Sequence, residues 1–94
     1  MKAIGVFGYH HTGKTTLATM LISALKERGY EVAAIKDIHN ENYHSDKEGS
    51  NSWRLAEAGA NPVFAKGLYD AALIYHPALE LPDMLHFLNA DWLV

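Results

Sequence analysis

The sequence predicts an α/β protein with a mostly parallel sheet, and three observations support this fold class. Residues 1–36 alternate between an apolar strand-like segment, an amphipathic helical segment and a second apolar strand-like segment. A loop with the pattern G-x-x-x-x-G-K-T joins the first strand to the helix. Further along, two short apolar segments separated by a turn predict a β-hairpin.

The first two strands and the helix between them form the predicted βαβ unit. We expect a buried strand at residues 3–7, a helix at about residues 13–28 and a second strand at residues 31–36. Gly29 is a natural residue to end the helix, and the two strands should run parallel with a right-handed crossover. The helix is expected to turn one apolar face inward, made of Leu17, Leu21, Ala24 and Leu25 with Met20 beside them.

The second half of the chain contains shorter elements. Residues 37–50 are polar and too long for a simple connection, which predicts a functional loop. A short helix at residues 51–58 follows, capped by Ser50 or Asn51. Strands are expected at residues 62–66 and 71–75. A last helix should begin near Pro82 with one apolar side, made of Met84, Leu85, Phe87 and Leu88, and a strand starts at residues 91–94.

Composition narrows the class of protein. The 94 residues are enough for one domain, and 49% of them are apolar, so the chain should fold. The absence of cysteine excludes disulfides and thiolate metal sites and fits a cytoplasmic location. A net charge of −3 argues against general nucleic-acid binding, and no apolar run approaches the length of a membrane span.

The loop between the first strand and the helix carries the strongest functional signal. Its two glycines let the backbone turn tightly, so that its N–H groups and the helix dipole can hold an anion. Lys14 can reach the β- and γ-phosphates of a nucleotide, and the Thr15 hydroxyl can ligate Mg²⁺. The predicted contacts are Gly8, Tyr9, His10, His11, Thr12, Gly13, Lys14, Thr15 and Thr16, the last of them at the α-phosphate.

Two carboxylates outside this loop are further candidates. Asp37 follows the second strand, at the carboxyl edge where parallel sheets bind ligands. We predict that it ligates Mg²⁺ through water or orients an attacking water, so that it and Lys14 form the catalytic pair; the alternative is a carboxylate that caps a turn. Asp46 and Lys47 in the long polar loop are predicted to contact Mg²⁺ or phosphate, with a solvated surface pair as the alternative.

Histidines and a tryptophan support weaker hypotheses. His10, His11, His39 and His44 raise the possibility of a Zn²⁺ or Ni²⁺ site, but adjacent histidines in a tight loop are poor chelators. Trp53 could stack on a base or a pterin, although a core anchor on a short helix is the more common role.

Residues 8–17, residues 35–39 and residues 46–60 together form a recognisable combination of motifs. This combination resembles the MobB family of molybdopterin-guanine dinucleotide biosynthesis proteins. In the third stretch the family typically shows Asp-x-x-Gly-Lys-Asp-Ser before a short helix that ends in Ala-Gly-Ala. This chain has Ser50 and Asn51 in place of the Lys-Asp pair, so a cation of the family pattern is missing there.

The resemblance implies a P-loop NTPase-like protein that binds GTP and Mg²⁺, hydrolyses GTP weakly at most, and is often a dimer. It would assist a partner nucleotidyltransferase that joins GMP to molybdopterin. The family continues past the strand at residues 91–94 with Glu-Gly-Phe, so we expect a shortened, N-terminal version of the domain. Asp91 lies at the wrong end of that strand to help hold Mg²⁺. A strand that stops there should expose a sheet edge, which dimerisation would cover.

Three alternatives remain open from the sequence. The first is a metallochaperone NTPase, which would need ordered histidine ligands. The second is a small-molecule kinase, although residues 37–50 are short for a lid. The third is a truncated, non-catalytic domain that binds a nucleotide or only a protein partner.

Overall fold

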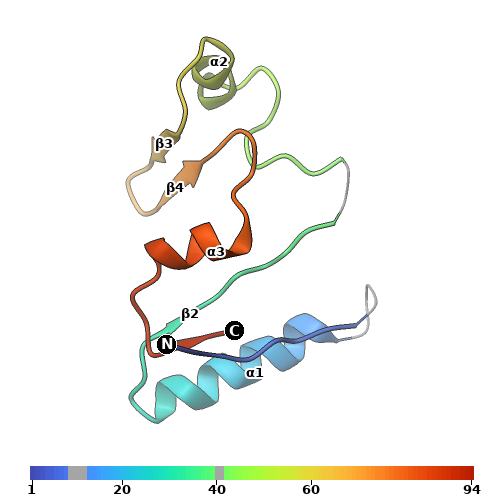
Figure 1. Ribbon diagram of the computed structural model, residues 1–94, viewed down its shortest axis with the longest axis vertical. Coiled ribbons are helices and arrows are strands. Elements are labelled where there is room, and N and C mark those ends of the chain that lie inside the picture. The colour runs from blue at the N-terminus through green and yellow to red at the C-terminus, as the bar shows by residue number, and fades with distance from the viewer. Residues whose placement is uncertain (9–12, 40–41) are drawn as a thin grey trace. The chain divides into compact units, whose positions relative to one another are not determined.

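The computed structural model describes residues 1–8, 13–39 and 42–94, which form two compact units (Figure 1). The first unit consists of Met1–Asp37 together with Leu85–Val94, and the second is the continuous segment Ile38–Met84. The second unit is therefore inserted between two strands of the first.

A parallel sheet of three strands forms the first unit, as the sequence predicts. The strands are β1 (Lys2–Ala3), β2 (Val32–Ala33) and β5 (Trp92–Leu93), and their order is β1-β5-β2. Hydrogen bonds continue past these short ladders, because Ile4 N donates to Leu93 O at 2.8 Å and Ile35 N donates to Val94 O at 3.0 Å. The last strand thus lies in the centre of the sheet, and the edges of the described sheet are β1 and β2.

Helix α1 (Lys14–Glu27) packs next to β2 (Figure 1), but its inward face differs from the predicted one. Leu21 and Leu25 are half-buried as expected, whereas Leu17, Met20 and Ala24 are exposed. The half-buried apolar positions recur at three- and four-residue steps, and they are Ala18, Leu21, Ile22 and Leu25. The periodicity predicted the helix correctly, but the face that it turns inward does not include Leu17.

The first strand is shorter and less buried than its apolar sequence predicts. Its paired residues end at Ala3, its ladder bonds end at Ile4, and the Phe7 side chain is 93% exposed. β1 is an edge strand, and it pairs with β5 on one side only. The apolar segment therefore predicted the strand correctly, but it did not predict which of its side chains are buried.

Asp91 joins the amino ends of the three strands. Its backbone O accepts from Lys2 N at 2.9 Å, its backbone N donates to Glu31 O at 2.9 Å, and its carboxylate Oδ2 accepts from Glu31 N at 2.8 Å. This confirms that Asp91 lies at the end of the sheet opposite the predicted nucleotide loop, and it gives the carboxylate a structural role.

Replacing Asp91 by alanine should lower the free energy of unfolding by about 0.5–1.5 kcal/mol, the net value of one such hydrogen bond. The matched control is Asp91→Asn, because an amide oxygen can still accept from Glu31 N. Urea denaturation of both variants measures the difference. Equal losses for Asp91→Ala and Asp91→Asn would contradict the assigned hydrogen bond.

The second unit contains helix α2 (Asn51–Glu57) and an antiparallel hairpin of β3 (Val63–Lys66) and β4 (Ala71–Ile74). Both were predicted, as was the Ser50 cap, whose Oγ accepts from Trp53 N at 3.3 Å. Helix α2 packs against β3. Among the described residues, Val63 and Ile74 are the buried apolar pair, and they lie opposite each other in the hairpin.

The last helix is shorter than expected. Helix α3 (Leu81–Met84) makes one turn and is followed by the 3₁₀ turn η1 (Leu85–Phe87). Met84 and Leu88 are half-buried, but Leu85 and Phe87 are exposed, so the predicted single apolar side is wrong. The change to about three residues per turn moves successive side chains off a common helical face.

Candidate functional site

The structure places Gly13 at the point where the nucleotide loop becomes a helix. Gly13 is the N-cap of α1 in the left-handed conformation, with φ +86°, and its carbonyl accepts from Leu17 N at 3.0 Å. Within the described part of the chain, no side chain caps this helix. The N–H groups of the first turn have no acceptor within the helix and point away from its N-terminal end. An anion placed at that end can accept hydrogen bonds from them.

Gly13→Ala should lower both the stability of the chain and its affinity for nucleotide. The position has open space for a Cβ, so the penalty comes from the positive φ and is about 1–2 kcal/mol. The strain can be relieved only by moving the first helical N–H groups, so nucleotide affinity should fall as well. Thermal unfolding with and without nucleotide checks both effects. Unchanged stability together with unchanged affinity would contradict the assigned backbone geometry.

Lys14 reaches back across the loop. Its Nζ donates to the Gly8 carbonyl oxygen at 2.7 Å, so the two ends of the motif are tied by a single side chain. Thr15 and Thr16 follow on the first turn of α1 with exposed side chains. The structure thus brings Gly8, Gly13 and Lys14 together at the start of α1, while the predicted contacts Tyr9, His10, His11 and Thr12 lie outside the described residues.

These residues fit a nucleotide phosphate bound with Mg²⁺. The glycine turn and the first turn of α1 supply N–H donors, and the Lys14 side chain supplies a positive charge near Gly8. Thr15 offers a hydroxyl oxygen and Asp37 a carboxylate, the oxygen donors that Mg²⁺ prefers. Asp37 is exposed and follows β2, at the same carboxyl edge of the sheet from which the nucleotide loop leaves β1.

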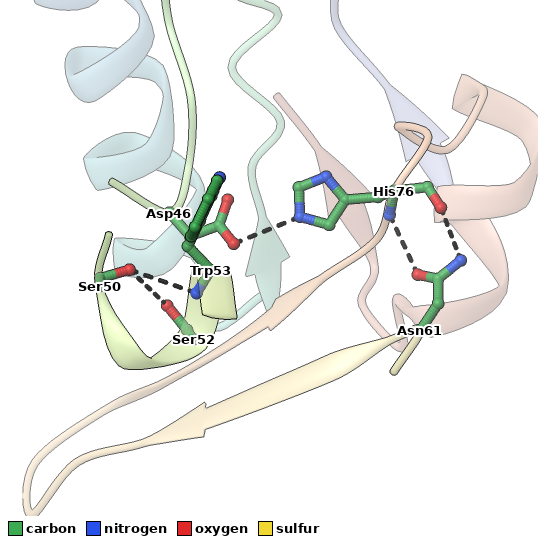
Figure 2. Close-up of polar contacts among 6 residues, drawn as sticks. All are labelled: Asp46, Ser50, Ser52, Trp53, Asn61 and His76. Carbon is green, nitrogen blue, oxygen red and sulfur yellow. Dashed lines mark hydrogen bonds and ion pairs between the residues drawn. The ribbon is translucent and has the colours of Figure 1, made fainter. Parts of the chain in front are cut away.

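Asp46 belongs to a separate polar cluster within the second unit (Figure 2). Its side chain is only 1% exposed, and its Oδ2 lies 3.3 Å from Nε2 of His76, whose side chain is 47% exposed. The backbone of His76 is held in turn by Asn61. Nδ2 of Asn61 donates to His76 O at 2.6 Å, and His76 N donates to Oδ1 of Asn61 at 3.0 Å.

This cluster connects three segments that are distant in sequence. It joins the loop before α2, the loop before β3 and the loop after β4, and Figure 2 shows His76 lying between the other two side chains. His76 and Asn61 were missed from the sequence. The sequence offered only a weak signal for these two residues. Asn61 and His76 each precede a proline near a strand of the hairpin, which indicates a turn but does not indicate which side chain they contact.

The remaining candidates occupy ordinary positions. Lys47 is exposed, and Trp53 is half-buried on α2. In residues 1–8, 13–39 and 42–94, no three His, Cys, Asp or Glu side chains gather as they would around a metal ion. His10 and His11 lie outside those residues, so the histidine hypothesis gains no support from the described part of the chain.

A parallel sheet, a glycine loop that ends in Gly13-Lys14-Thr15, and a helix that starts at that loop define a class. The chain is an α/β protein of the P-loop type, whose members bind nucleotides at this position. Among the described residues, no helix combines the length and the apolar character needed to cross a membrane.

Comparison with known proteins identifies the family. Residues 3–94 match MobB, Molybdopterin guanine dinucleotide synthesis protein B, and the chain belongs to this family. A putative molybdopterin-guanine dinucleotide biosynthesis adapter protein of Methanocaldococcus jannaschii is 42% identical over 97 residues, covering 100% of this chain and 39% of the relative.

Two bacterial relatives carry the name molybdopterin-guanine dinucleotide biosynthesis adapter protein. The protein of Haemophilus influenzae is 47% identical over 60 residues, which cover 64% of this chain and 33% of the relative. The protein of Escherichia coli is 39% identical over 72 residues, which cover 77% of this chain and 38% of the relative. The chain thus spans between 33% and 39% of the length of these three relatives.

Proposed function

We propose that the chain is a GTP-binding accessory protein of molybdopterin guanine dinucleotide biosynthesis, which assists the nucleotidyltransferase that joins GMP to molybdopterin. The observation that carries the proposal is the geometry of the described loop residues: Lys14 donates to the Gly8 carbonyl at the start of α1, where Gly13 is the N-cap. Membership of the MobB family and the adapter names of the relatives support the pathway.

In this proposal each loop residue acts on the nucleotide phosphates. Lys14 exchanges the neutral Gly8 carbonyl for charged β- and γ-phosphate oxygens, which form stronger hydrogen bonds. The amides that lead into α1 hold the same phosphates, and Thr16 contacts the α-phosphate. Thr15 and Asp37 are the proposed Mg²⁺ ligands; Mg²⁺, when bound, neutralises charge on the β- and γ-phosphates.

Catalysis would be limited to positioning and charge stabilisation. Asp37 is the carboxylate that we propose to orient a water molecule, and slow GTP hydrolysis is the expected outcome. The contact from Asp46 to the ligand stays a prediction, because the Asp46 carboxylate pairs with His76 within the second unit. A homodimer in the cytoplasm remains part of the proposal, and the sheet edges that it would cover are β1 and β2.

The proposed function is tested by reconstitution. Dinucleotide formation is measured with the nucleotidyltransferase of the same organism, molybdopterin, GTP and Mg²⁺, with and without this chain. The chain should increase the yield, Lys14→Ala should remove the increase, and Lys26→Ala at the other end of α1 should keep it. An increase that survives Lys14→Ala would contradict a nucleotide-dependent role, and no increase with the wild-type chain would contradict the accessory role.

A further inference from the structure

We draw no further inference here: the strongest candidate, the polar side-chain cluster of Asp46, His76 and Asn61 that joins three loops of the second unit, belongs to the site already described, and no third His, Cys, Asp or Glu side chain of the described residues gathers with the Asp46–His76 pair to hold a metal ion.

Discussion

Replacing Lys14 by alanine is expected to weaken nucleotide binding by roughly a hundredfold while the chain remains folded. Each hydrogen bond to a charged group contributes about 1.5–3 kcal/mol, and Lys14 is placed to make more than one with β- and γ-phosphate oxygens. Without nucleotide, its partner is the exposed carbonyl of Gly8. The variant should therefore lose nucleotide affinity, with little change in its free energy of unfolding.

Lys26→Ala is the matched control for this prediction. Lys26 lies in the last turn of the same helix and pairs with Glu31 at 3.7 Å, with both side chains largely exposed. Equilibrium dialysis with labelled GTP and Mg²⁺ should give wild-type affinity for Lys26→Ala and a large loss for Lys14→Ala. Similar affinities for the two variants would show that the nucleotide does not occupy the loop.

Replacing His76 by alanine is expected to destabilise the second unit by about 1–3 kcal/mol. The Asp46 carboxylate is almost fully buried and lies against Nε2 of His76, so the variant leaves a buried acceptor without that donor. The expected loss stays below that for a fully buried ion pair, because nearly half of the His76 side chain reaches solvent. Chemical denaturation followed by Trp53 fluorescence, in a Trp92→Phe background, measures the loss in this unit.

A second substitution distinguishes an unpaired carboxylate from a simple loss of packing. Adding Asp46→Asn to His76→Ala should recover part of the lost stability, because a neutral amide costs less to bury than a charge. His86→Ala, at an exposed position of η1, is the control and should change little. A double variant less stable than His76→Ala would contradict the proposed role of the Asp46–His76 pair.

Features with local causes could be predicted from the sequence. Gly13 is the N-cap of α1 and adopts a positive φ, as the motif requires. Ser50 caps α2 because a serine side chain satisfies a first-turn N–H group. The hairpin follows from two short apolar segments around a turn, and its register pairs Lys66 with Ala71 as that turn allows.

Features that depend on distant residues could not be predicted in the same way. The order of strands in a sheet does not follow from their order along the chain, so the sequence could not place β5 in the centre. It also did not predict that Phe7 is exposed. Asp46 and His76 are 30 residues apart, and no periodicity relates them. The loop position of Asp46 indicated a ligand contact, whereas its burial depends on a partner beyond the hairpin.

A guanine-nucleotide site at the start of α1 is tested most directly by calorimetric titration of the full chain with GTP, GDP and ATP in the presence of Mg²⁺. We predict that the guanine nucleotides bind at one site per chain, that ATP binds more weakly, and that Lys14→Ala removes the heat of binding. Binding of ATP as tightly as GTP would contradict a GTP-dependent role, and the absence of any binding would contradict a nucleotide site in this loop.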